Sequence, residues 1–135
     1  MVPLDIPEIK EAQELFDRFE KKQQSLDGVA YYVQAREILD LYVEENPSSP
    51  FIKVISEKKK TYLKLLIKNL QFINTSNFYN WINLYIILLS SGIETVETIT
   101  SNDKDLQKIY DNYVNEWKDT QELNNFIKIF IKEQA

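Results

Sequence analysis

The chain has 135 residues, with 16 Lys and Arg against 21 Asp and Glu, two glycines, and no cysteine or histidine. The lack of cysteine and histidine excludes disulfides, zinc–thiolate sites and thiol nucleophiles, and it removes the commonest general base near neutral pH. Two glycines leave little material for tight hairpins or phosphate-binding loops, so the composition predicts an all-α protein, and the net charge of −5 argues against general affinity for nucleic acid.

Apolar periodicity predicts two helices before residue 46. The first spans about residues 7–24, with Asp5 as its cap. Its apolar face follows spacings of three, four and three residues: Ile9, Ala12, Phe16 and Phe19. After a break at residues 25–28, the second helix is expected to continue to residue 45. Its face repeats the same spacing and is widened by three further residues: Tyr32, Ala35, Leu39 and Tyr42, with Tyr31, Ile38 and Leu41.

A third, basic helix is predicted from about residue 50 to residue 73, after the proline-rich break at residues 46–50. Its apolar residues share one sector of the helix: Ile52, Ile55, Tyr62, Leu63, Leu66, Leu70 and Ile73. A different face carries a lysine row made of Lys53, Lys60, Lys64 and Lys68. Lys59 falls inside the apolar sector, so its amine is expected to extend outward to water.

The second half of the chain predicts three or four more helices. The segment at residues 77–90 is apolar on nearly all sides and is expected at the centre of the fold. Residues 93–99 suggest a short helix, with a strand left open as the alternative. A helix from residue 101 or 102 carries Leu106, Tyr110, Tyr113 and Trp117, and a capping box at residues 119–122 begins the last helix. The apolar face of the last helix is formed by Leu123, Phe126, Ile127, Phe130 and Ile131.

These elements predict an all-α bundle of six or seven helices. Residues 1–74 would form a three-helix module, and residues 75–135 a second helical module packed on the first. No segment approaches the roughly twenty apolar residues that a membrane span requires. The first residues also lack the pattern of a signal peptide, so a cytoplasmic protein is expected.

Two pairs of carboxylates suggest one possible chemistry. Glu11 and Glu14, followed by Glu37 and Asp40, resemble the Glu-x-x-Glu and Glu-x-x-Asp pattern of all-α nucleotide pyrophosphohydrolases of the MazG type. Carboxylate oxygens suit Mg²⁺, and residues three apart on a helix can share one ion. Both pairs, however, lie off the apolar faces of their helices and point away from the core that would gather them. The sequence therefore assigns no catalytic or metal-ligating residue and no cofactor, and it predicts a non-enzymatic protein.

The lysine row suggests an alternative role in nucleic-acid binding. Lys53, Lys60, Lys64 and Lys68 are spaced by seven, four and four residues, which would let them follow a phosphate backbone. Their helix contains no arginine, the residue that makes most base-specific contacts. The competing interpretation is a solvated helix face.

The second and third helices together suggest a protein-binding surface. Glu37, Asp40 and Glu44 form an acidic row on the second helix, and the lysine row lies on the third. Two packed helices with an apolar seam between unlike charges can receive a third, amphipathic helix. We therefore expect Glu37, Asp40 and Glu44 to bind the partner, with the lysine row as a second surface. The competing interpretation is that the rows pair with each other or with water, which contributes only tenths of a kcal/mol per pair.

Three short motifs, in the same order along the chain, resemble one known family. They are Asp27-Gly28-Val29-Ala30-Tyr31-Tyr32, Asn77-Phe78-Tyr79, and the segment from Tyr113 to Thr120 with its Tyr, Trp, Lys and Thr. The sequence is similar here to the Vta-type ESCRT cofactors, which regulate the Vps-four ATPase, although Gly28 stands where the family carries proline. The resemblance implies tandem MIT-like three-helix modules, seven helices in all, that bind helical tails of ESCRT-III subunits. It further implies a peripheral location at endosomes, a role in multivesicular-body sorting, and no small-molecule substrate.

Overall fold

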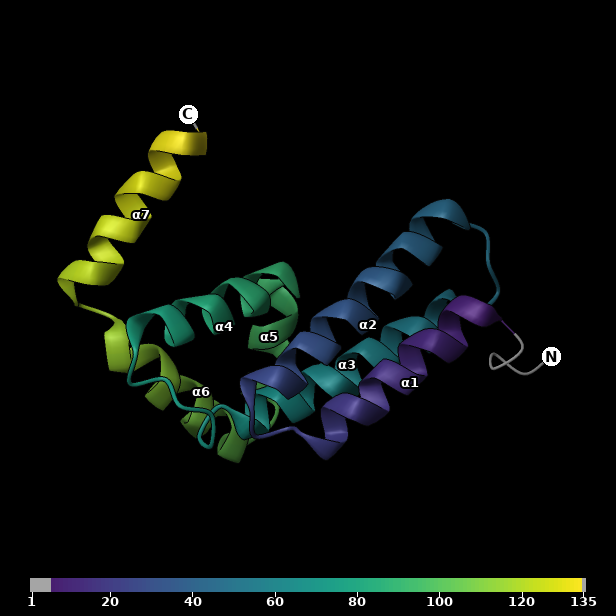
Figure 1. The fold of residues 1–135 in the computed structure, drawn as a ribbon, viewed down its shortest axis with the longest axis horizontal. Helices are drawn as coiled ribbons and strands as arrows, with labels where there is room; N and C mark the ends of the chain where they lie inside the picture. The colour runs from purple at the N-terminus through teal and green to yellow at the C-terminus, as the bar shows by residue number, and fades with distance from the viewer. Residues whose placement is uncertain (1–5, 135) are drawn as a thin grey trace. The chain divides into compact units, whose positions relative to one another are not determined.

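The structure, a computed structural model, describes residues 6–134, apart from the side chains of residues 131, 133 and 134. Within that range the fold is all-helical and contains no strand, which confirms the predicted fold class (Figure 1). The helices are α1 (Pro7–Lys21), α2 (Leu26–Glu45), α3 (Ile52–Asn69), α4 (Phe78–Ser90), α5 (Ile93–Ser101), α6 (Lys104–Trp117) and α7 (Gln121–Gln134). The chain divides into two compact units, Met1–Ile73 and Asn74–Ala135, called here the N-terminal and C-terminal units.

The predicted apolar faces of α1 and α2 form the core of the N-terminal unit. Their eight residues are all buried: Ile9, Ala12, Phe16, Phe19, Tyr32, Ala35, Leu39 and Tyr42. Leu41 is 54% exposed, so the prediction that it widens the buried face of α2 was wrong. The physical reason is its angular position, about 180° from Tyr32 around the helix.

The turn between α1 and α2 lies at residues 22–25, earlier than the break at residues 25–28 that the sequence predicted. Helix α1 ends at Lys21, and the side chain of Ser25 caps α2 by accepting a hydrogen bond from the Gly28 N–H at 3.2 Å. A Cβ atom at position 28 would lie 2.0 Å from the backbone oxygen of Lys22, so only glycine fits where the first turn of α2 passes the end of α1. The predicted cap, Asp5, lies outside the described residues.

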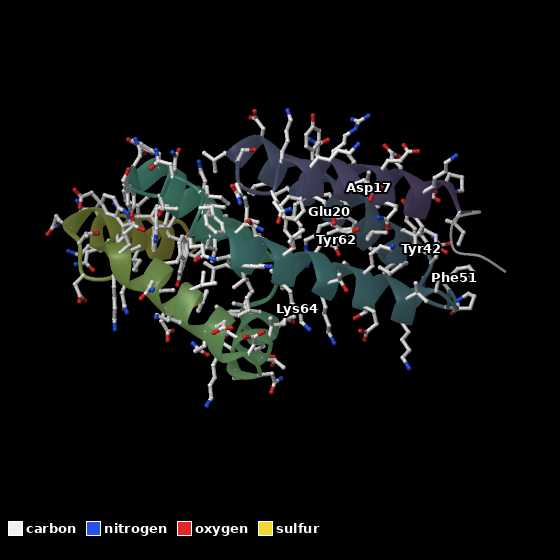
Figure 2. All side chains as sticks on the ribbon, turned by 90° about the horizontal axis from the view of Figure 1, so that it is seen from below. Asp17, Glu20, Tyr42, Phe51, Tyr62 and Lys64 are labelled. Atoms are coloured by element: carbon white, nitrogen blue, oxygen red, sulfur yellow. The ribbon has the colours of Figure 1, made fainter. Side chains whose placement is uncertain are left out.

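Helix α3 is attached to α1 by an aromatic stack and by polar side chains. The rings of Phe16 and Tyr62 are stacked, with centroids 4.1 Å apart, and Gln13 donates a hydrogen bond to the Tyr62 hydroxyl at 2.9 Å. Asn69 donates to the Gln23 side chain at 2.8 Å. Tyr62 therefore lies on the side of α3 that faces α1, whereas Lys64 lies on the opposite side (Figure 2).

The end of α3 differs from the prediction. The helix stops at Asn69, and the N–H groups of Phe72 and Ile73 turn back to the Asn69 carbonyl oxygen at 3.0 and 3.2 Å. Leu70 and Ile73 are nevertheless buried, as their place in the apolar sector predicted.

In the C-terminal unit, α4 and α6 are joined by two reciprocal hydrogen bonds. The Trp81 indole N–H donates to the Tyr113 backbone oxygen at 2.8 Å, and the Tyr113 hydroxyl donates to the Trp81 backbone oxygen at 2.7 Å. Their rings are stacked with centroids 5.3 Å apart. At the end of α6, the Trp117 indole N–H donates to the Thr75 backbone oxygen at 2.9 Å. This hydrogen bond holds the segment before α4 against α6.

The connections in the C-terminal unit settle two open points. Residues 93–101 form the helix α5 and no strand, and Gly92 precedes it with a φ of 98°, a conformation that favours glycine. Helix α6 begins at Lys104, slightly later than predicted, because the Asp103 side chain accepts from the N–H groups of Asp105 and Leu106.

Helices α4 and α7 are less covered than the sequence predicted. Ile86 and Leu89 of α4 are 41% and 44% exposed, so the expectation that α4 lies at the centre of the fold was wrong. Helix α7 starts where Thr120, instead of the predicted box at residues 119–122, accepts a hydrogen bond from the Leu123 N–H. None of its described side chains is buried.

Among the described residues, no single helix is both long and apolar enough to cross a bilayer. Helices α4 and α5 reach that length and composition only when taken together, and they are bent by 93°.

The stability of the C-terminal unit should fall at alkaline pH. Burial raises the pKa of the Tyr113 hydroxyl well above its ordinary value of 10.0. The folded unit thus keeps a proton that the unfolded chain releases near pH 10, and the free energy of unfolding decreases as the pH rises above 10. Both tryptophans of the chain lie in this unit, so tryptophan fluorescence during urea unfolding measures its stability.

Tyr113→Phe tests this linkage. At neutral pH the variant should lose about 0.5–1.5 kcal/mol, because the Trp81 backbone oxygen loses the bond from Tyr113 and keeps only its hydrogen bond within helix α4. Above pH 10 its stability should decline less steeply than that of the wild type. An equal decline in the two proteins would show that Tyr113 is not the group responsible.

Candidate functional site

The acidic row predicted on α2 surrounds an exposed leucine. Glu37, Asp40 and Glu44 are exposed, and so is Leu41. Leu41 follows Glu37 by four residues and precedes Glu44 by three, so the three side chains are neighbours on the helix surface. We call Glu37, Asp40, Leu41 and Glu44 the acidic α2 surface.

One member of this surface has an internal partner. Lys59 of α3 forms an ion pair with Asp40 at 2.6 Å, so its amine does extend out of the apolar sector. In the described part of the chain, Glu37 and Glu44 form no ion pair. Asp40 therefore links α2 to α3. The carboxylates of Glu37 and Glu44 have no ion-pair partner among the described residues and can pair with basic side chains of another molecule.

The lysine row lies on the solvent side of α3. Lys53, Lys60, Lys64 and Lys68 are all exposed, and Figure 2 shows Lys64 on the side of α3 away from α1. No acidic residue pairs with any of the four among the residues that the structure describes. The row thus remains a cationic surface and does not neutralise the acidic row of α2.

The carboxylates of the pyrophosphohydrolase alternative are not gathered. Glu11, Glu14, Glu37 and Asp40 are exposed. Residues 6–134 hold no group of three or more Asp or Glu side chains placed to bind one metal ion. The four carboxylates are therefore not brought together as one such group in the described part of the chain.

An apolar groove between α4 and α7 is a second candidate site, and the sequence did not predict it. One wall is made by Ile82, Tyr85, Ile86 and Leu89 of α4. The other is made by Leu123, Phe126, Ile127 and Phe130 of α7. The groove has a volume of about 380 Å³, and none of its described lining residues is charged. Its signal in the sequence was the all-round apolarity of α4, which was interpreted as core.

The described residues thus offer two surfaces with different chemistry. The acidic α2 surface combines one apolar side chain with free carboxylates, and the α4–α7 groove is apolar and uncharged. Comparison with known proteins found no family model, curated protein or solved structure that matches this chain.

The ion pair between Asp40 and Lys59 should contribute little to stability. Both side chains reach solvent, so Asp40→Asn is expected to lower the free energy of unfolding by less than about 1 kcal/mol, and by less still at high salt. Urea unfolding monitored by circular dichroism at low and high salt measures the change. A salt-independent loss above about 2 kcal/mol would instead make Asp40 a structural residue.

Proposed function

We propose that the protein is a non-enzymatic adaptor that binds an amphipathic helical segment of a partner protein on its acidic α2 surface. The observation that carries this proposal is Leu41, a leucine 54% exposed to solvent between two carboxylates that form no ion pair with any residue the structure describes. An isolated exposed leucine needs no explanation, but one flanked by free like charges on a single helix face fits a partner with an apolar stripe and basic flanks.

The charge of the surroundings favours a basic partner. Residues 1–50 carry 11 acidic and 5 basic side chains, so the acidic α2 surface lies in an acidic part of the sequence. Complementary charge speeds the encounter and selects the partner, while the apolar contact at Leu41 provides affinity after docking. Glu37 and Glu44 would pair with basic residues on both sides of the apolar stripe.

The sequence resemblance supports a more specific form of this proposal. In that form the bound segment is the helical tail of an ESCRT-III-type subunit, and the adaptor acts at the cytoplasmic side of endosomes in multivesicular-body sorting. The three helices α1–α3 of the N-terminal unit are consistent with an MIT-like module.

Titration of a fluorescent ESCRT-III tail peptide with the full chain tests the function. Leu41→Ser, and the double variant Glu37→Lys with Glu44→Lys, should each weaken binding by about tenfold or more, because each removes a central contact. Glu20→Lys is the matched control: it reverses the charge of an exposed carboxylate on α1, outside the acidic α2 surface, and should leave affinity nearly unchanged. No binding at several hundred micromolar protein, or equal loss in the control, would overturn the proposal.

The lysine row favours one alternative function, the binding of nucleic acid. The observation that favours this alternative is that the four lysines of the row are exposed on α3 and pair with no described acidic residue. This alternative predicts binding to a labelled RNA or DNA oligonucleotide that weakens steeply with salt and is lost in Lys60→Glu with Lys64→Glu. Binding that does not change with salt concentration or with these substitutions would exclude nucleic-acid binding through the lysine row.

A further inference from the structure

Helix α7 exposes an apolar stripe that its own unit does not cover. It has 14 residues, and a helix of that length is only marginally stable in water without packing. Yet none of its described side chains is buried, and Ile127 and Phe130 are 42% and 52% exposed. In Figure 1, α7 extends away from α6, with one side toward α4 and no helix along its other side. A further surface packed on this stripe would therefore stabilise α7.

We propose that the α4–α7 groove is the interface through which two copies of this chain form a homodimer. The α7 of each copy lies in the groove of the other, so that α4 and α7 of both copies form a four-helix layer. The proposal uses none of the residues of the acidic α2 surface and does not depend on the proposed function.

The absence of charge in the groove favours a second copy as the occupant. A two-fold interface places the same patch of both copies against itself, so any charge near the axis would meet a like charge. Helix α4 contains no charged residue, and neither do the described groove residues of α7. Lys128 and Lys132 of α7 are exposed and lie, by helical periodicity, on the side opposite the groove, where they stay hydrated. The patch is thus complementary to itself.

The dimensions of the groove agree with this occupant. At 1.5 Å per residue, the lining segments of α4 (residues 82–90) and of α7 (residues 123–130) both run for about 12–13 Å. The lining segment of an α7 from a second copy therefore matches the length of the wall that it would contact.

The exposed apolar area is sufficient for a weak dimer. With about 150–250 Å² for a large side chain, the exposed parts of Ile86, Leu89, Ile127 and Phe130, together with their half-buried neighbours, provide on the order of 400 Å² per copy. Two copies would bury about 800 Å² of apolar surface, which is the apolar share of an interface near the lower bound of about 1,200 Å². We therefore expect a dimer that forms at micromolar concentration.

Sedimentation equilibrium of the full chain over about 5–500 µM tests the proposal. The wild type should pass from monomer to dimer within this range. Ile127→Glu should weaken the dimer at least tenfold, because it places a charge at the centre of the apolar interface. Ile129→Glu is the matched control: Ile129 lies on the same helix and is 58% exposed, but it does not line the groove, so the dimer should persist.

A substitution in the other wall separates loss of the interface from loss of the helix. Ile86→Glu on α4 should weaken the dimer as strongly as Ile127→Glu, with circular dichroism and tryptophan fluorescence unchanged at low concentration. A wild type that remains monomeric at 500 µM overturns the proposal. So does a dimer that is indifferent to Ile127→Glu and Ile86→Glu, or one that Ile129→Glu disrupts equally.

Discussion

The reciprocal hydrogen bonds between Trp81 and Tyr113 are the constraint on which the C-terminal unit depends. Each residue donates a side-chain hydrogen to the backbone oxygen of the other, and both rings are stacked in the core. Because no water reaches these groups, a rotation of α4 would leave buried polar atoms unpaired. Helix α4 is thereby held by one face, and Ile86 and Leu89 on another face remain exposed at the α7 groove.

A comparable constraint orients α3 in the N-terminal unit. Its Tyr62 is stacked on Phe16 of α1, and its Lys59 reaches Asp40 of α2. With these two side chains engaged, the lysine row lies on a face of α3 that α1 and α2 do not cover. The same packing buries the Tyr32 side of α2 and leaves Leu41, on the opposite side, between Glu37 and Glu44. The exposure of Leu41 is therefore a consequence of how the core is packed, whereas its acidic neighbours follow from the helical spacing.

The two surfaces differ in what they can recognise. The acidic α2 surface discriminates by charge, so it suits a transient partner with basic residues and is sensitive to salt. The α4–α7 groove has no charge to discriminate with, so its selectivity rests on shape and on the length of the two helices.

The sequence by itself determined which residues form helices and which side of most helices is buried. Ile9, Ala12, Phe16 and Phe19 were predictable because the helical period and the hydrophobic effect act within one segment. Only the tertiary structure decided the partners of the long-range contacts, such as Asp40 with Lys59 and Trp81 with Tyr113, which are 19 and 32 residues apart. It also decided that α4 is partly exposed. Periodicity identifies an apolar face but carries no information about which neighbour covers it, and the α4–α7 groove remains open because nothing described in the C-terminal unit fills it.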